Sequence, residues 1–133
     1  MSHIVNISEA ASIGIHVIVL IARSKSTNMN VKKLSEVTGA SKNHIAKVMQ
    51  RMVKYNFVKS TRGPSGGFVL NKPAEEISLL NIYEALEGEM AITICPFEHQ
   101  ICPFDQCMFG GVVHKVTNEL RDYFTNKKVS DLI

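Results

Sequence analysis

The sequence predicts a mainly α-helical fold with one small β-hairpin, and three observations support this prediction. Apolar residues recur at intervals of three and four in several segments of the 133-residue chain, which is the spacing of a helix face. Serines and glycines stand where these segments begin and end, as helix caps do. A glycine- and proline-rich stretch separates two short runs of β-prone residues. We therefore expect a winged helix-turn-helix plus a long C-terminal dimerisation helix.

The first helix is expected over Ile7 to Arg23, with Ser8 as its N-cap and Glu9 in the first turn, where a negative charge suits the helix dipole. Its apolar run is too short and too polar to span a bilayer. Glu9, Ser12 and His16 share one face of this helix. This polar strip is either a solvated edge or a set of side chains that reaches a bound cofactor.

The helix-turn-helix is expected in the next segment. A short helix from Val31 to Thr38 ends at Gly39, because glycine accepts the left-handed backbone that ends helices. Ser41 is a fitting N-cap for a second helix from Lys42 to about Tyr55. The expected inward side chains are Leu34 and Val37 on the first helix and Ile45, Val48, Met49 and Met52 on the second.

The N-terminal part of the second helix carries the residue types that read DNA. In a helix-turn-helix this part enters the major groove. Here it presents donors, amides and cations without an acid, at Ser41, Lys42, Asn43, His44 and Lys47. Short helix pairs with basic surfaces also occur in proteins that bind no nucleic acid, so the neighbouring hairpin matters for the interpretation.

The hairpin is expected to form a wing beside these helices. Strands over Phe57–Thr61 and Phe68–Leu70 flank a tight exposed turn with three glycines and a proline. Such a turn lets the backbone approach a phosphate closely. The expected contacts to the DNA backbone or minor groove come from Lys59, Arg62, Ser65 and Gly66.

The charge of the chain is divided unevenly. Residues 1–73 hold eleven lysines and arginines against two acids, and residues 74–133 hold four against ten, so the two parts carry +9 and −6 within a total of +3. A positive surface of this kind attracts a polyanion. The first part therefore carries the electrostatic footprint of a nucleic-acid-binding protein.

The remainder of the chain is expected to hold two further helices around an irregular segment. Ser78 caps a helix over Leu79–Leu86 that ends at Gly88, and a long helix runs over Phe109–Asn126. Its apolar stripe comprises Val112, Val113, Val116, Leu120, Tyr123 and Phe124. We expect this stripe to pair with a second subunit, the alternative being a helix packed only on its own chain. The expected division is a DNA-binding domain at 1–88, a cofactor loop at 89–108 and a dimerisation helix with tail at 109–133.

All three cysteines lie in the irregular segment, at Cys95, Cys102 and Cys107. Three thiols this close favour an iron–sulfur cluster, with redox thiols or a zinc site as alternatives. The fourth ligand is open, with His99, Glu9, His16 and His114 as candidates.

Other classes of function are disfavoured. The N-terminus lacks the features of a signal peptide, so we expect a cytoplasmic protein that does not enter a membrane. No paired acid and base residues stand out, and no phosphate-cradling motif precedes a helix, so an enzyme is not expected. A protein-interaction module with a basic face for an acidic partner remains an alternative.

The chain resembles the Rrf-two type winged-helix transcription regulators, the IscR/NsrR-like family, over nearly its whole length. The resemblance rests on ISEAASIGIHVIVLIA near the start, LSEVTGASKNHIAKVMQRM, the wing VKSTRGPSGGFVL and the three-cysteine loop before a long helix. It implies a homodimer on a pseudo-palindromic operator, with affinity controlled by a [2Fe–2S] or [4Fe–4S] cluster on the three cysteines. Some members carry no cluster and respond through thiols or partner proteins.

Two positions depart from the pattern that the resemblance implies. Cluster regulators of this type place a histidine three residues after the last cysteine, where this chain has Gly110. Other members complete the site with an acid on the first helix, where this chain has Ser12 between Glu9 and His16. The resemblance therefore leaves the fourth ligand and the cluster type undetermined.

Overall fold

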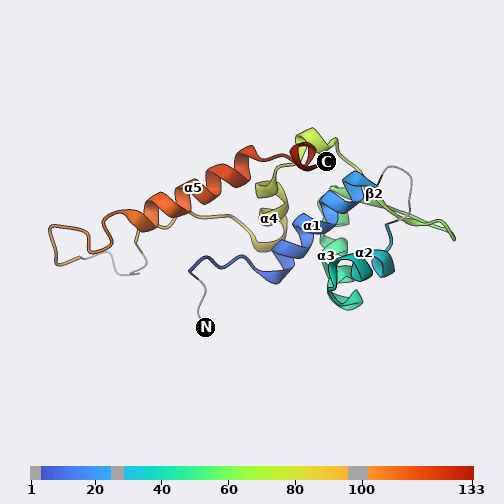
Figure 1. The fold of residues 1–133 in the computed structure, drawn as a ribbon, viewed down its shortest axis with the longest axis horizontal. Helices are drawn as coiled ribbons and strands as arrows, with labels where there is room; N and C mark the ends of the chain where they lie inside the picture. The colour runs from blue at the N-terminus through green and yellow to red at the C-terminus, as the bar shows by residue number, and fades with distance from the viewer. Residues whose placement is uncertain (1–3, 25–28, 96–101) are drawn as a thin grey trace.

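The computed structural model describes residues 4–24, 29–95 and 102–133. In chain order the elements are the helices α1 (Glu9–Arg23), α2 (Val31–Thr38) and α3 (Lys42–Lys54), the strands β1 (Val58–Thr61) and β2 (Gly67–Leu70), the 3-10 turn η1 (Ala74–Glu76), the helices α4 (Leu79–Glu87) and α5 (Val112–Asn126), and the 3-10 turn η2 (Val129–Leu132). Figure 1 shows a helical body from which the hairpin and α5 extend in opposite directions. The mainly helical fold with one hairpin is confirmed.

Helix α1 runs through the middle of the body and packs against α2, α3 and α4. Ser8 caps it as predicted, because its hydroxyl accepts the backbone N–H of Ala11 at 3.0 Å, so the helix begins at Glu9 and not at the expected Ile7. Its side chains Val17 and Ile18 are fully buried. Gly14 allows α4 to approach closely, since a Cβ atom at Gly14 would stand 2.3 Å from a methyl carbon of Leu86.

The helix-turn-helix forms as predicted. Gly39 takes a left-handed backbone with φ of 77° and ends α2, and the Ser41 hydroxyl accepts the His44 N–H at 3.1 Å to begin α3. The whole expected stripe of α3 is buried in the core, with Leu34 of α2 beside it: Ile45, Val48, Met49 and Met52.

The burial of Val37 and the start of the last helix differ from the expectation, each for a local reason. Val37 was expected inward, but its side chain is 56% exposed because it lines an open groove between α1 and α2. The last helix was expected from Phe109 and begins at Val112. Gly110 and Gly111 have φ of 59° and 74°, and this left-handed backbone cannot continue a right-handed helix.

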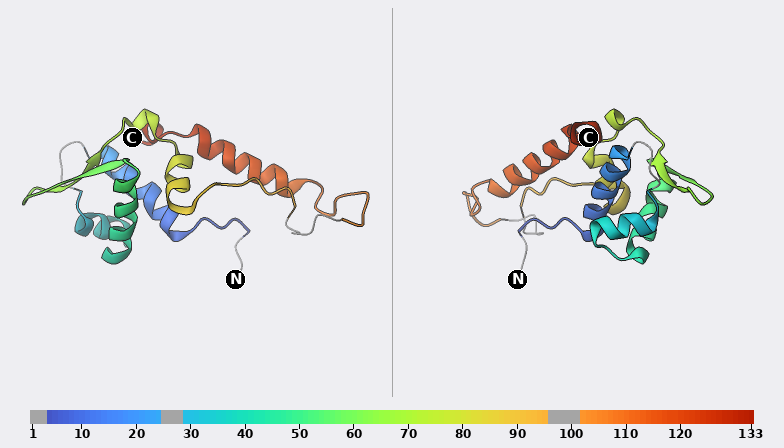
Figure 2. Two further views of the ribbon diagram at one scale, coloured as in Figure 1. Left: turned by 180° about the vertical axis from the view of Figure 1, so that it is seen from behind. Right: turned by 45° about the vertical axis from the view of Figure 1, so that its right-hand side comes forward.

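The C-terminal residues return to the body. Val129 is fully buried, and its N–H donates to Ile77 O at 2.8 Å, while the Leu79 N–H donates to Lys127 O at 3.0 Å. Phe124 at the end of α5 joins the same core cluster. The start of α5, by contrast, lies far from the body, as both views in Figure 2 show. Among the described residues, no helix has the length and apolar character that a membrane crossing requires.

Candidate nucleic-acid interface and cysteine loop

The first turns of α3 present the predicted base-reading residues to solvent. Ser41, Lys42, Asn43 and Lys47 are exposed, and His44 is half-buried. The buried stripe on the opposite side of α3 fixes the direction in which these side chains point. The helix therefore offers a rigid row of hydrogen-bond donors and cations of the kind that fits a major groove.

The wing is a short antiparallel hairpin with a tightly closed tip. Its register pairs Lys59 with Val69 and Thr61 with Gly67. The Thr61 hydroxyl accepts the Gly67 N–H at 3.0 Å, and the Gly66 N–H donates to Gly63 O at 2.8 Å. A Cβ atom at Gly66 would stand 2.5 Å from Thr61 O, so only glycine fits this turn.

Close packing also holds the base of the wing. The Phe68 N–H donates to Met29 O at 3.0 Å, which adds one bridge to the edge of β2. A Cβ atom at Gly67 would meet the Met29 backbone at 3.0 Å. No local pattern indicates this role of Gly67, since its contact comes from a residue far along the chain. The predicted wing cations Lys59 and Arg62 and the predicted Ser65 are exposed, and Gly66 is half-buried.

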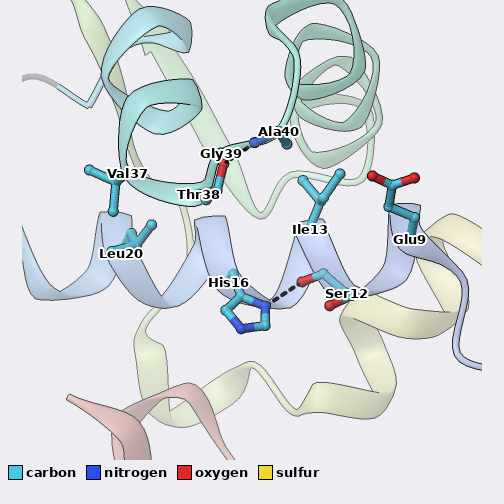
Figure 3. Close-up of a pocket in the computed structure, with 9 residues that line it drawn as sticks. All are labelled: Glu9, Ser12, Ile13, His16, Leu20, Val37, Thr38, Gly39 and Ala40. Atoms are coloured by element: carbon cyan, nitrogen blue, oxygen red, sulfur yellow. Dashed lines mark hydrogen bonds between the residues drawn. The ribbon is translucent and has the colours of Figure 1, made fainter.

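The polar strip of α1 lines the groove between α1 and the turn that joins α2 to α3. This groove has a volume of about 410 Å³, and Glu9, Ser12 and His16 come from successive turns of α1 along it (Figure 3). Ser12 O accepts a hydrogen bond from His16 Nδ1 at 2.7 Å, which leaves Nε2 of a neutral ring as an acceptor. The Glu9 carboxylate lies 3.9 Å from Nδ1 of His44, so it faces α3 of its own chain.

The described segments that follow α4 and precede α5, which carry the cysteines, extend away from the wing (Figure 1). Cys95 ends the described part of the segment that follows α4, and Cys102 and Cys107 precede α5; all three are exposed. His99, one of the predicted fourth ligands, lies outside the described residues. Within the described ranges, no group of three histidine, cysteine or acidic side chains is close enough to hold a metal ion.

Cys107 sits beside the turn that begins α5. Backbone hydrogen bonds from Gly111, Phe109 and Gly110 lower the pKa of its thiol, since an amide N–H stabilises the thiolate more than the neutral thiol. Thiolate is the form that binds metal ions. The donor chemistry of three exposed thiols in one loop fits a thiolate-bound metal or cluster.

Arg51 is a residue whose role the sequence analysis missed. It lies in the last turn of α3, and its guanidinium donates from Nε at 3.2 Å and from Nη2 at 3.0 Å to Ala85 O of α4. Because its partner is 34 residues away in sequence, no local pattern could have identified the contact.

A family model described as Rrf2, iron-dependent transcriptional regulator, matches residues 7–133 of the chain. The chain belongs to the Rrf2 family. This Rrf2-family protein is 26% identical over 100 residues to the HTH-type transcriptional regulator IscR of Pectobacterium atrosepticum, a match that covers 75% of the chain and 61% of that relative. The chain thus matches less than two thirds of the length of this curated relative.

Solved structures share the fold of the Rrf2-family protein. The global cysteine regulator CymR of B. subtilis matches with a TM-score of 0.77 at 19% identity, over 97% of this chain and 96% of that one. T. potens IscR matches with a TM-score of 0.74 at 21% identity, over 96% and 85% of the two chains. The oxidised form of Staphylococcus aureus CymR matches with a TM-score of 0.75 at 23% identity, over 94% and 93%. The winged-helix fold of transcriptional regulators is therefore confirmed.

Proposed function

We propose that this Rrf2-family protein is a cytoplasmic, homodimeric transcriptional regulator and not an enzyme. It binds a pseudo-palindromic operator, and an iron–sulfur cluster on Cys95, Cys102 and Cys107 controls its affinity. The observation that carries the proposal is the exposed row of donors and cations on the first turns of α3, with a glycine-closed wing beside it.

The DNA contacts follow from the arrangement of the exposed side chains. Ser41, Lys42, Asn43 and His44 read base edges from the start of α3, and Lys47 contacts a phosphate. On the wing, Lys59 and Arg62 hold phosphates, and the narrow tip at Ser65 and Gly66 lets the backbone approach the duplex. The charge of +9 on residues 1–73 supports this orientation.

The cysteine loop is the regulatory part of the proposal. A bound cluster would supply redox chemistry, whereas the chain supplies three exposed thiols, one of them with its pKa lowered by backbone N–H groups. Glu9 and His16 line a groove in the body, whereas residues 102–108 lie beyond the start of α5 (Figure 1). A fourth ligand from α1 would therefore come from the second subunit.

Selection of duplexes from a random pool tests the DNA-binding part. We expect an inverted repeat whose half-sites lie about 34 Å apart, one helical turn, because two recognition helices enter successive major grooves. Binding that weakens with salt but shows no preference among sequences would favour a basic surface for acidic partners instead.

Analysis of anaerobically purified protein tests the cluster. We expect iron and acid-labile sulfide in matched amounts, and their loss in Cys102→Ser with the fold retained. Protein without either, even after reconstitution, would leave the alternative of a cluster-free regulator that senses through its thiols, through zinc or through a partner protein. A full cluster in Cys102→Ser would exclude the three-thiolate site.

A further inference from the structure

The last turn of α4 receives hydrogen bonds from several elements of the body. Arg51 of α3 donates from two nitrogen atoms to Ala85 O, at 3.2 and 3.0 Å. The Ser8 hydroxyl at the start of α1 donates to the Glu87 carboxylate. This turn of α4 therefore contacts both the recognition helix and the helix that packs behind it.

The same turn holds the segment that leads to the cysteine loop. The Glu84 carboxylate accepts the Met90 N–H at 2.9 Å, and Arg121 of α5 donates to Met90 O. Further along, the Thr117 hydroxyl of α5 lies 3.1 Å from Thr93 O, two residues before Cys95, and shares its one hydrogen between this oxygen and carbonyl oxygens of its own helix. We call residues 89–95 the stem of the cysteine loop.

The position of this turn matters because the two working parts of the chain lie at opposite ends. In Figure 1 the wing and α3 lie on one side of α4, and the stem and α5 extend away on the other. The described part of the cysteine loop therefore lies away from α3 and the wing of its own chain, and within one chain a change there reaches them through the elements between. Helix α4 is joined to both parts, because Ala85 O accepts from Arg51 of α3 and the Glu84 carboxylate accepts the Met90 N–H of the stem.

We infer that Arg51 is a positioning residue of the recognition helix, and that its bond to the last turn of α4 couples the stem of the cysteine loop to DNA binding. The inference rests on the proposed function and specifies how its regulation is transmitted. Movement of Met90 shifts Glu84 and the last turn of α4, and Ala85 O then moves the end of α3 through the guanidinium of Arg51. A coupling of this kind acts in both directions, so DNA binding must also change the stem.

Hydrogen exchange of the wild-type protein with and without the selected duplex tests the coupling. The Met90 and Gly88 amides both donate to Glu84, at the end of α4 and the start of the stem. We expect DNA to slow hydrogen exchange of these two amides by about fivefold or more. In Arg51→Ala this DNA-induced difference is lost. If Arg51 only stabilised the fold, its removal would speed exchange of these amides equally with and without DNA. The DNA-induced difference in exchange would then remain.

Matched variants separate the effect of the hydrogen bond from Arg51 to Ala85 O from the effect of the positive charge of Arg51. Lys54→Ala removes a cation from the same turn of α3 and should keep the difference. Arg51→Lys, which keeps the charge but has a single donor nitrogen, should restore part of it. Arg121→Gln weakens the other end of the path and should lower the difference even where Arg51→Ala fails to fold.

The possible results distinguish a failure of the inferred coupling from a failure of the proposed function. Wild-type protein that binds the duplex without any change at Met90 overturns the inference and leaves the proposed function standing. An undiminished change in both Arg51→Ala and Arg121→Gln does the same. Wild-type protein that binds no duplex overturns the proposed function, and the coupling falls with it.

Discussion

At the residue scale, single exposed cations of the wing carry a measurable share of the proposed DNA affinity. Arg62→Ala should weaken binding to every duplex, because a phosphate contact carries no sequence information. It should also lower the slope of log affinity against log salt by about one unit, since one fewer counterion is released. Binding isotherms at several salt concentrations measure both effects.

The control for Arg62→Ala is Lys115→Ala. Lys115 is an exposed cation of α5, near the cysteine-loop end of the molecule, so its removal changes the net charge equally without touching the wing. An Arg62→Ala protein that altered only the preferred sequence, with its salt slope unchanged, would show that this side chain reads bases and not phosphates.

A second residue-scale prediction concerns the thiol of Cys107 in metal-free protein. Backbone hydrogen bonds lower its pKa, so its thiolate forms at lower pH than in an unfolded chain. The rate of alkylation of Cys107 should therefore rise with pH earlier in the native protein than in a denatured sample, as mass spectrometry of its peptide can measure. Equal pH profiles in the two samples would contradict the contact with the start of α5.

At the element scale, the recognition helix depends on its cap. The Ser41 hydroxyl accepts the His44 N–H, and this N–H would lose its partner in Ser41→Ala. We expect a loss of about 0.5–2 kcal/mol in the free energy of unfolding, measured by urea titration. The control is Ser60→Ala, at an exposed position of β1. An equal loss of unfolding free energy in this variant would show that the Ser41 cap has no particular effect on stability.

Local patterns predicted most elements because their causes are local. Ser8, Ser41 and Ser78 cap helices through amides three residues away, and Gly39 ends α2 through its own backbone. The hairpin likewise follows from its turn residues. Features that depend on distant contacts could not be predicted, such as the bond from Arg51 to Ala85 O and the approach of Met29 to Gly67.

The candidate site divides in the same way. The side chains expected at the start of α3 and on the wing are presented to solvent, because helical and hairpin periodicity fixes which face each occupies. The fourth ligand could not be predicted, since a ligand set depends on distances between segments far apart in the sequence. For the same reason, spacing alone does not determine whether Glu9 and His16 meet the cysteines.

At the scale of the whole molecule, part of the apolar stripe of α5 stays exposed to solvent among the described residues. Val112, Val116 and Tyr123 are 56%, 42% and 53% exposed, whereas Phe124 is buried against the body. Val116→Glu should therefore leave the fold intact and convert the proposed dimer to a monomer, because a second subunit would have to bury the new charge. Light scattering measures the mass.

The matched control is Asn118→Glu, which places the same charge on an exposed position of α5, about half a turn away from the stripe. This variant should remain dimeric. A wild-type monomer, or an unchanged dimer in Val116→Glu, would mean that the stripe of α5 is not the dimer interface. Pseudo-palindromic recognition would then need another explanation.

The central claim is that the cysteine loop controls how tightly α3 and the wing bind DNA. The most direct measurement is the dissociation constant for the selected operator, determined without oxygen at one stated salt concentration, for wild-type protein and for Cys102→Ser. The proposal predicts that the two constants differ by about 5- to 150-fold, the usual range of coupling between sites. Equal constants for two folded, sequence-specific proteins would contradict it.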